Sequence, residues 1–577
     1  MTQSSDSFAH LHVHTEYSML DGAAKISDLV DEVARQEMPA VAVTDHGVMF
    51  GAYEFWKKAT SAGINPIIGI EAYLTPGTPR GDKTRVTWGS GGEDDVSGAG
   101  AYTHLTLMAE NTTGMHNLFR MSSLASLEGY YFKPRMDRDL LQTYASGVIA
   151  TTGCPSGEVQ TRLRLGQYDE ALAAAAEFRD IFGADNYFVE LMDHGLGIEK
   201  RVMSDLVRLS KDLGIPLCVQ SGSTLDDPKR FKFDSSEFYV KSAAQMRTLF
   251  ADFPEACDNT LLIAQRASVS FDEAANYMPL FPVPEGESET SFFEKEVQRG
   301  LQERYPEGIP ERVQAQADYE IGVISQMGFA SYFLVVADFI NWAKEHGIRV
   351  GPGRGSGAGS MAAYAMRITE LDPLQHGLIF ERFLNPDRVS MPDFDVDFDE
   401  RRRGEVIRYV SDKYGDDRVA QIVTFGTIKA KQALKDSSRV LGFPFGMGEK
   451  LTKLMPTGVM GKEMSLDGVL DKSHERYREA ADLRELVESD PEAKQVFETA
   501  QGLENLKRQW GVHAAGVIMS SSPLLDIIPI MRREQDGQIV TQFDFPASEA
   551  LGLVKMDFLS LRNLTIIDDA LDNIELN

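Results

Sequence analysis

Residues 391–399 read Met-Pro-Asp-Phe-Asp-Val-Asp-Phe-Asp, an alternation of acidic and apolar side chains with a period of two. In an extended strand this pattern places Asp393, Asp395 and Asp397 on one face and the apolar residues on the other. The apolar face predicts packing into a core, whereas neighbouring carboxylates oppose one another's ionisation and need a partner. Such a row is typical of a Mg²⁺ site, since Mg²⁺ prefers carboxylate oxygens and substrate phosphates. The alternative is a solvated acidic edge strand that resists aggregation.

A glycine-rich segment precedes this strand. Residues 350–360 read Val-Gly-Pro-Gly-Arg-Gly-Ser-Gly-Ala-Gly-Ser and lead into a helix-forming segment at 361–366. Small residues let the backbone approach a phosphate, and the free N–H groups that open the next helix favour an anion. No Gly-Lys-Ser/Thr follows, so the segment is not a P-loop of the ATPase kind.

A second apolar strand is predicted at residues 552–559, Gly-Leu-Val-Lys-Met-Asp-Phe-Leu, with Lys555 and Asp557 on one face. Carboxylates on two strands, a basic side chain and a phosphate-binding segment are the parts of a two-metal phosphoryl-transfer site. The three regions together therefore predict that chemistry more strongly than any one of them alone.

The N-terminal part of the chain alternates apolar strands with helical segments, and a possible metal ligand stands in or after each strand. These residues are His12, His14, His46, Glu71, His104 and Cys154. Strand and helix in alternation predict a parallel β/α barrel with its ligands at one rim. A lone histidine is more often structural, but a His-x-His pair followed by further ligands at strand ends favours a metal site.

The composition limits the classes of function. A chain of 577 residues with 43% hydrophobic residues is long enough for about four domains. The formal charge of −29 excludes a uniformly basic surface, so any DNA contact must come from local basic patches. The three cysteines, Cys154, Cys218 and Cys257, lack Cys-x-x-Cys spacing and fit a reducing compartment. Since no signal peptide and no apolar run of about 18 residues is present, we expect a cytoplasmic protein without a membrane partner.

Four segments resemble the bacterial DNA polymerase III α subunit family, the replicative C-family polymerases, in an actinobacterial-like form. They are the glycine-rich segment, Glu-Arg-Phe-Leu-Asn-Pro at 381–386, the acidic strand, and residues 553–559. The resemblance implies a multidomain α/β and α+β protein. Its expected parts are a PHP-type (polymerase and histidinol phosphatase) distorted β/α barrel at 1–275, a nucleotidyltransferase-like palm with preceding helices at 276–425, an inserted helical thumb at 426–505, and a second palm segment at 506–577.

This resemblance implies a DNA-directed DNA polymerase that extends a primer 3′-OH during chromosomal DNA replication. Asp393, Asp395 and Asp557 are then expected to hold two Mg²⁺ ions. The residues expected to bind the nucleotide are Gly355, Ser356, Arg354, Arg382 and Lys555. Expected partners are primer–template DNA, deoxynucleoside triphosphates and replisome subunits that include the sliding clamp, although the family's clamp-binding region is absent from this chain.

In the PHP part, the resemblance matches seven residues to metal-ligand positions for Zn²⁺ or Mn²⁺. They are His12, His14, Asp21, His46, Glu71, His104 and Cys154. Such a domain can be a phosphoesterase or a 3′–5′ exonuclease. The family pattern continues with an Asn-Asp-x-His element, but here residues 214–217 run directly into 218–223, which resembles a later segment. We therefore expect an incomplete ligand cluster, shortened near 217–218, with weak or lost exonuclease activity.

The end of the chain is a second departure from the family pattern. Only 20 residues follow Asp557 (577 − 557), whereas the family continues into fingers and further domains. Because alignment of reactants supplies much of the rate enhancement, we expect impaired polymerisation without fingers. Two other hypotheses stay open: that the surviving activity is PHP-type phosphoester hydrolysis, and that the chain is a catalytically silent fragment.

Overall fold

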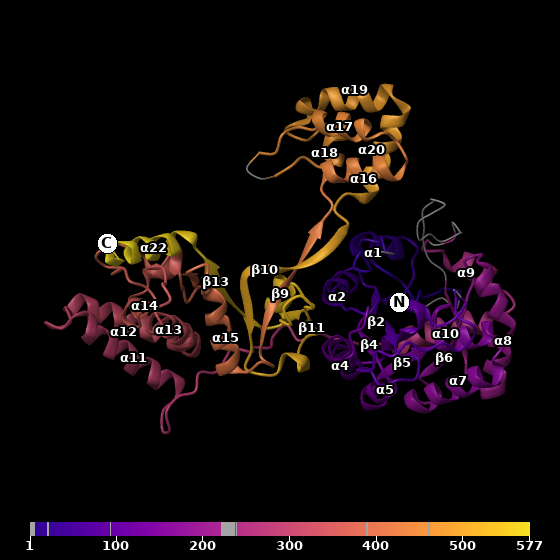
Figure 1. Cartoon of the computed structure of the whole chain (residues 1–577), viewed down its shortest axis with the longest axis horizontal. Coiled ribbons are helices and arrows are strands. Elements are labelled where there is room, and N and C mark those ends of the chain that lie inside the picture. Colours follow the sequence, from indigo (N-terminus) through magenta and orange to yellow (C-terminus); the bar gives the residue numbers. More distant parts are fainter. Residues whose placement is uncertain are drawn as a thin grey trace. The chain divides into compact units, whose positions relative to one another are not determined.

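The computed structural model describes residues 6–19, 22–92, 94–220, 237, 239–387, 391–459 and 462–576. The chain divides into two compact units, each assembled from segments that are far apart in the sequence (Figure 1). The first unit contains residues 1–118, 137–269 and 424–511, and the second contains residues 119–136, 270–423 and 512–577.

The first unit is built on a mixed sheet with the strand order β1-β2-β3-β5-β6-β7. The strands are β1 (Ala40–Val43), β2 (Asn65–Leu74), β3 (Thr103–Ala109), β5 (Val148–Thr151), β6 (Tyr187–Met192) and β7 (Leu217–Gln220). β1 is parallel to β2, and β5, β6 and β7 are parallel to one another, but β3 is antiparallel to both of its neighbours. The expectation of a parallel sheet is therefore wrong for β3. The described connection from β2 to β3 holds only the four-residue α3 (Ser97–Gly100) and not the long helix that normally carries a parallel crossover.

The two edges of this sheet are joined by residues 10–13. On one side, backbone N–H groups at β1 donate to carbonyl oxygens of this segment at 2.7 and 2.8 Å. On the other side, the side chain of Gln220 on β7 accepts from Leu11 N at 3.1 Å and donates to His12 O at 2.6 Å. A side-chain amide thus takes the place of a backbone ladder. The His-x-His pair consequently lies on an irregular segment, where the sequence predicted a strand, and the sheet curls into the expected distorted barrel.

Helices flank this sheet and pack on it through amphipathic faces. Those of the first unit before residue 270 include α1 (Ile26–Arg35), α2 (Ala52–Ser61), α5 (Arg138–Tyr144), α6 (Glu158–Arg164), α7 (Tyr168–Phe182), α8 (Gly197–Leu213), α9 (Ala243–Leu249) and α10 (Pro254–Arg266). In α1 the buried residues are Ile26, Leu29, Val30 and Val33, the spacing of one helical face.

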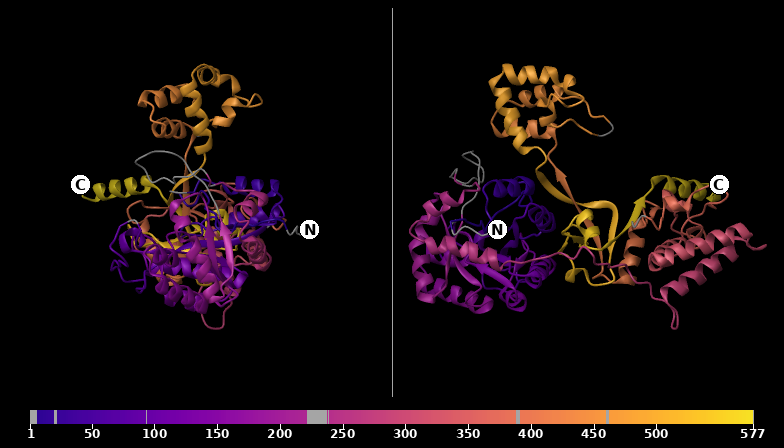
Figure 2. Two further views of the ribbon diagram at one scale, coloured as in Figure 1. Left: turned by 90° about the vertical axis from the view of Figure 1, so that its right-hand side faces the viewer. Right: turned by 180° about the vertical axis from the view of Figure 1, so that it is seen from behind.

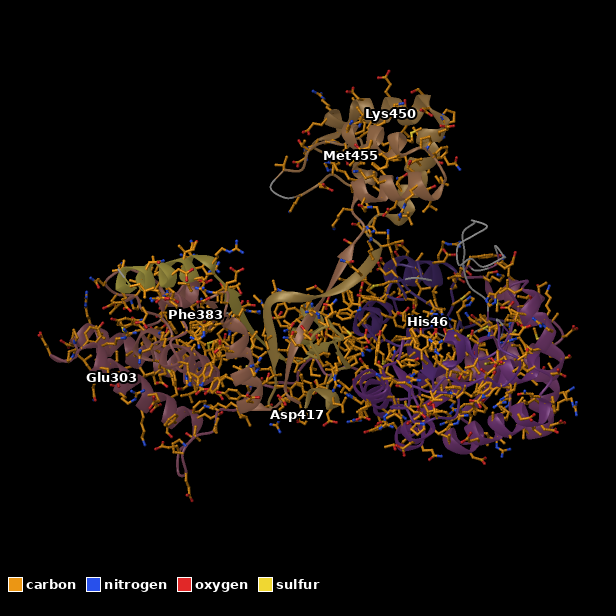
Figure 3. All side chains as sticks on the ribbon, in the orientation of Figure 1. His46, Glu303, Phe383, Asp417, Lys450 and Met455 are labelled. Atoms are coloured by element: carbon orange, nitrogen blue, oxygen red, sulfur yellow. The ribbon has the colours of Figure 1, made fainter. Side chains whose placement is uncertain are left out.

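The segment between β9 (Val419–Thr427) and β10 (Lys507–Met519) folds into helices with a core of its own (Figure 2). The helices are α16 (Ala430–Val440), α17 (Phe445–Leu454), α18 (Leu466–Leu470), α19 (Ala481–Ser489) and α20 (Pro491–Leu503). Met455, labelled in Figure 3, belongs to this core. α20 begins sharply because the carboxylate of Asp490 accepts from the N–H groups of Glu492 and Ala493, while Pro491 takes the first helical position.

The second unit is built on a sheet with the strand order β11-β12-β9-β10-β13-β8. Its remaining strands are β11 (Ile530–Arg532), β12 (Ile539–Thr541), β13 (Val554–Ser560) and β8 (Asp395–Phe398). β13 is parallel to β8 and antiparallel to β10. In the acidic strand Phe394, Val396 and Phe398 are at most 5% exposed, so the predicted apolar face is confirmed.

The apolar face of these strands packs on α13 (Ala330–Glu345). The ring of Phe339 lies 4.8 Å from that of Phe558 and 6.3 Å from that of Phe398. Phe383, labelled in Figure 3, extends this core with its ring 4.6 Å from that of Phe394. Around it are α11 (Glu289–Arg304), α12 (Glu311–Gln326), η1 (Ser356–Gly359), α14 (Met361–Ala365), η2 (Phe380–Arg382), α15 (Arg403–Tyr414), α21 (Phe545–Ala550) and α22 (Arg562–Leu576).

In the described ranges no single helix is long and apolar enough to cross a membrane. Among the described helices, only α12 and α13 taken together have that length and composition, and they are bent by 112° relative to one another.

Candidate metal centres

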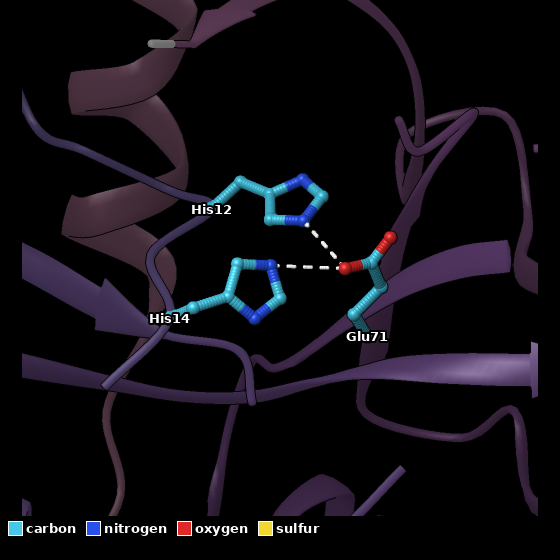
Figure 4. Close-up of side chains that lie close together, drawn as sticks. All are labelled: His12, His14 and Glu71. Carbon is cyan, nitrogen blue, oxygen red and sulfur yellow. Dashed lines mark ion pairs between the residues drawn. The ribbon is translucent and has the colours of Figure 1, made fainter. Parts of the chain in front are cut away.

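Four histidines surround one buried carboxylate in the first unit. Glu71, on β2, is 1% exposed. Its Oε2 lies 3.2 Å from His12 Nε2 and 2.9 Å from His14 Nε2, and both side chains turn toward it in Figure 4. The same oxygen is 3.1 Å from His46 Nδ1, and Oε1 is 2.7 Å from His104 Nδ1. The structure therefore brings five of the predicted ligands to one point.

The strands explain this convergence. His46 follows β1 and pairs with Glu71 of β2 through an isolated parallel bridge, while His104 lies on the neighbouring β3. Cys154 follows β5, and its Sγ is 3.3 Å from His104 Nδ1. Burial raises the pKa of the Cys154 thiol well above its usual value, and Glu71 adds to this effect. Asp21, the remaining predicted ligand, lies outside the described residues, as does most of the predicted shortened region after Gln220.

A second carboxylate, which the sequence reasoning missed, orients His12 from behind. Glu190, on β6, is 3% exposed, and its Oε1 lies 2.9 Å from His12 Nδ1. Its other oxygen accepts a hydrogen bond from the Thr151 hydroxyl. An N–H at Nδ1 leaves Nε2 to face the centre. The available signal was an acidic residue inside the otherwise apolar run Tyr-Phe-Val-Glu-Leu-Met at 187–192.

Asp45 fixes the turn that carries His14. Its carboxylate accepts from Thr15 N at 2.7 Å, from Thr15 Oγ1 at 2.8 Å and from Ser18 Oγ at 2.8 Å. Ser18 Oγ in turn lies 3.1 Å from His14 Nδ1. The His-x-His segment is thus held in place by side chains, which compensates for the missing strand.

The charges of the side chains at this centre indicate whether a cation would be stable there. Burial alone would lower the pKa of His12, but Glu190 and Glu71 raise it to about 10. A protonated imidazole therefore stands between two buried carboxylates, where a metal ion would supply the same positive charge. Two triads, His12–His14–Glu71 and His46–Glu71–His104, each offer donor atoms within 4.8 Å of one another. Imidazole nitrogen and carboxylate oxygen are donors that suit a transition-metal ion.

Three aspartates form a different centre in the second unit. Asp395 of β8 and Asp557 of β13 are directly paired neighbours on adjacent parallel strands. Together with Asp393 they offer carboxylate oxygens within 4.8 Å of one another, as the period-two pattern predicted for one face. Asp393 is exposed and Asp557 is buried, so the centre opens to solvent on one side. Oxygen-only ligands in this number suit Mg²⁺ with substrate phosphates completing the shell.

Positive charge is scarce around these aspartates. Lys555 Nζ lies 2.6 Å from Asp557 Oδ2, while Oδ1 of Asp557 accepts no hydrogen bond from the described residues. Desolvation raises the pKa of Asp393, and Asp557 and Asp395 raise it further against the opposing effect of Lys555. Burial opposes protonation of Lys555, but Asp557 outweighs it and raises the pKa of the ammonium group. An orphaned buried oxygen and an excess of carboxylates fit a centre that binds cations.

The glycine-rich segment lies directly over the acidic strand. Gly351 N donates to Asp397 O at 2.8 Å, and Arg354 Nη1 is 3.3 Å from Asp397 Oδ1. Gly355 has a φ of +63°, and a Cβ there would lie 3.4 Å from Asp395 Oδ2. Ser356 opens η1, and η2, which carries the exposed Arg382, packs against η1. The nucleotide-binding residues predicted in this segment therefore lie beside the aspartates.

One part of the predicted phosphate site is wrong. The sequence reasoning expected free N–H groups at the start of the helix after the glycines. In the structure Met361 N and Ala362 N donate to the carboxylate of Glu320 at 2.9 and 3.0 Å, and Ala363 N donates to Ser360 Oγ at 3.1 Å. An internal carboxylate has taken the place of the anion, so the N–H groups of residues 361–363 are not free to bind a phosphate.

Comparison with known proteins matches both centres to families. The family model of the bacterial DNA polymerase III alpha NTPase domain matches residues 291–560, and that of the PHP domain matches residues 10–194. The chain is 57% identical over 600 residues to the DNA polymerase III subunit alpha of Mycobacterium tuberculosis, covering 99% of this chain and 51% of that relative. The same-named protein of Mycobacterium leprae is 56% identical over 606 residues (100% and 51%), and that of Thermus aquaticus 42% over 645 residues (98% and 51%). The chain spans about half the length of the curated relatives it matches.

Proposed function

Because the chain belongs to the bacterial DNA polymerase III alpha subunit family, we propose that its second unit carries a nucleotidyl-transfer site. The reaction is the template-directed addition of a deoxynucleotide to a primer 3′-OH with release of pyrophosphate. Its substrates are primer–template DNA and deoxynucleoside triphosphates in the cytoplasm, and its partners are replisome subunits that include the sliding clamp. The observation that carries the proposal is the direct pairing of Asp395 with Asp557 beneath the glycine-rich segment.

The side chains take distinct roles in this proposal. Asp393, Asp395 and Asp557 would hold two Mg²⁺ ions, which when bound supply the charge that activates the 3′-hydroxyl and stabilises the leaving pyrophosphate. Lys555 already lies among these carboxylates and would neutralise charge on the triphosphate as the bond breaks.

The glycine-rich segment would position the nucleotide. Gly355 and Ser356 allow the triphosphate to approach the backbone closely, because a glycine presents no Cβ. Arg354 and Arg382 would pair with phosphate oxygens through their forked guanidinium groups. Arg354 Nη1 lies 3.3 Å from Asp397 Oδ1, so this side chain is directed toward the acidic strand.

The test is incorporation of one nucleotide on a primed template with Mg²⁺, comparing the chain with its Asp395→Ala variant. Loss of a carboxylate metal ligand removes several kcal/mol of transition-state stabilisation, so incorporation should fall about 100-fold or more. Asp338→Ala is the matched control, because Asp338 is a carboxylate of the same unit that contacts Lys413, Tyr409 and Tyr414 and lies outside the triad. An equal loss in both variants, or normal incorporation by Asp395→Ala, would contradict the site assignment.

A second candidate function belongs to the Glu71 centre. We infer phosphoester hydrolysis dependent on Zn²⁺ or Mn²⁺, because four imidazoles and a carboxylate converge there. A 3′–5′ exonuclease activity of this centre would be weak, because the sequence lacks the Asn-Asp-x-His element that would complete the ligand cluster. Release of nucleotides from a 3′-labelled strand should then be lost in His12→Ala and retained in Asp395→Ala. Absence of release by the unaltered chain with either metal would exclude this activity and leave the centre a structural role.

A further inference from the structure

Glu320 is a buried carboxylate whose four hydrogen-bond partners are all neutral. It lies on α12 and is 0% exposed. Its Oε2 accepts from Ser360 Oγ at 2.8 Å and from Ala362 N at 3.0 Å. Its Oε1 accepts from Met361 N at 2.9 Å and from Gln316 Nε2 at 2.9 Å. Three of these bonds end on residues 360–362, immediately after the glycine-rich segment.

Such a carboxylate is costly, so its presence needs a reason beyond stability. Burial raises the pKa of Glu320, against the effect of its hydrogen bonds, which means that the surroundings oppose its charge. A buried ionised group without a cationic partner loses hydration that hydrogen bonds replace only in part. An apolar side chain would fill the same space at lower cost, but it could not hold residues 360–362.

The glycine-rich segment is anchored at both ends. Its first end is fixed by Gly351 N, which donates to Asp397 O at 2.8 Å. Its last end is fixed by Glu320 and by a close fit at Gly359, where a Cβ would lie 2.8 Å from Ile379 O. Gly355 lies between these two anchors, has a positive φ and stands over Asp395. The position of this residue therefore depends on both anchors.

We propose that Glu320 is a positioning residue for nucleotide binding, which holds Gly355 and Ser356 over the aspartates and directs the triphosphate to them. This inference rests on the proposed polymerase function. The carboxylate has a second effect, because it occupies the N–H groups at the start of α14 and repels any other anion from them. The triphosphate would therefore bind to the part of the glycine-rich segment before Ser360, which lies beside the metal-binding aspartates.

The experiment is a titration of the 577-residue chain with a fluorescent dATP analogue in the presence of Mg²⁺, using Glu320→Gln. Glutamine has nearly the same shape but presents an NH₂ group toward backbone donors, so one bond of the anchor is replaced by a repulsion. We expect nucleotide affinity to fall about tenfold, the scale of loss when a group that orients a binding residue is removed. Mn²⁺ affinity at the three aspartates should change less than twofold, because the aspartates stand on the strands.

Val313→Ala is the matched control, because Val313 is buried on the same helix and its side chain has no hydrogen-bonding group that could anchor the segment. It should lower the melting temperature and leave nucleotide affinity unchanged. If both variants lose affinity in proportion to their loss of stability, Glu320 is only structural and the proposal is overturned. If Glu320→Gln does not fold, Ser360→Ala decides: a weaker nucleotide affinity supports the proposal and an unchanged one overturns it.

The outcome also separates this inference from the proposed function. Unchanged nucleotide affinity in a folded Glu320→Gln variant overturns the positioning role alone. Failure of the unaltered chain to bind either Mn²⁺ at the aspartates or the nucleotide overturns the polymerase site, and the positioning role with it.

Discussion

Around Glu71 one buried carboxylate faces four imidazoles, whereas around Asp395 three carboxylates share the ammonium group of Lys555. At the first centre Glu190 and Glu71 raise the pKa of His12 to about 10, so a protonated imidazole offsets one of two buried carboxylates. At the second centre one ammonium group faces three carboxylates, so the excess of negative charge is larger. The second centre therefore offers more negative charge to a cation than the first.

The two centres also differ in how they are held. Glu190 contacts His12 directly, and Asp45 holds the turn that carries His14 through Thr15 and Ser18. At the aspartates the corresponding support comes from backbone, since strand pairing places Asp395 beside Asp557 and a glycine-rich segment closes over them. Substitutions should therefore affect the two centres differently, and four of them test this comparison.

The largest effect is expected for Glu71→Gln. Burial opposes ionisation of Glu71, but His46, His104 and His12 outweigh it and hold its pKa well below the usual range. Removing this charge leaves buried imidazoles without their common partner, so the free energy of unfolding of the metal-free protein should fall by about 3–5 kcal/mol at neutral pH. Urea unfolding in EDTA measures it. An unchanged value would mean that the carboxylate contributes nothing to the stability of its centre.

A smaller effect, a loss of metal affinity, is expected for Glu190→Gln. This variant keeps Glu71 and the four histidines around it. Without a carboxylate behind it, His12 loses the bond that sets its tautomer, and Mn²⁺ affinity at this centre should drop about 10–100-fold. Glu199→Gln is the matched control, because Glu199 is an equally buried carboxylate paired with a histidine, His194, outside the cluster. Equal losses of metal affinity in the two variants would contradict the role of Glu190.

Gly355→Ala tests the backbone support of the aspartates. A side chain at a φ of +63° costs about 1 kcal/mol of stability. Gly377→Ala has the matching φ of +64° with nothing within 4 Å of its Cβ, so it should cost the same. Only Gly355→Ala should weaken nucleotide binding, which a fluorescent nucleotide titration measures. Equal nucleotide affinities of the two variants would show that the glycine-rich segment does not contact the nucleotide.

The smallest effect, and one of opposite sign, is expected for Asp393→Asn. The pKa of Asp393 in the folded protein is raised above its ordinary value of about 3.8. Protonated Asp393 therefore contributes to stability below pH 3.8, and this contribution is lost as the pH rises through the raised pKa. The variant should therefore become more stable than the parent by about 0.3 kcal/mol near neutral pH, after screening by water.

Melting temperatures from pH 4 to pH 7 without metal measure this difference, which should widen as pH rises. High salt should reduce it. A variant that is less stable than the parent across this range would show that the aspartates do not repel one another.

The sequence predicted the acidic strand well because its information is local. A period of two fixes which face each residue takes, and the burial of Phe394, Val396 and Phe398 follows from it. The ligands at strand ends were also predictable, since successive strands of one sheet bring their ends together. In both cases the chemistry is visible in the residues that perform it.

The supporting residues could not be predicted in the same way. Glu190 contacts His12 across 178 residues of sequence, and Glu320 reaches Ser360 across 40. Neither has a motif of its own, because orienting a neighbour requires only one carboxylate at the right place. The direction of β3 depends on its connection from β2, which in the described residues holds only the four-residue α3 and not a crossover helix.

The side-chain amide of Gln220 links residues 10–13, which carry the His-x-His pair, to β7. We call this junction the seam of the barrel. In a true strand, a shift of one residue turns every side chain to the opposite face. Across this seam no backbone ladder ties the segment to β7 among the described residues, because one side chain makes both bonds. A change at Gln220 alone would therefore release the segment that carries two ligands from β7, while its backbone bonds to β1 remain.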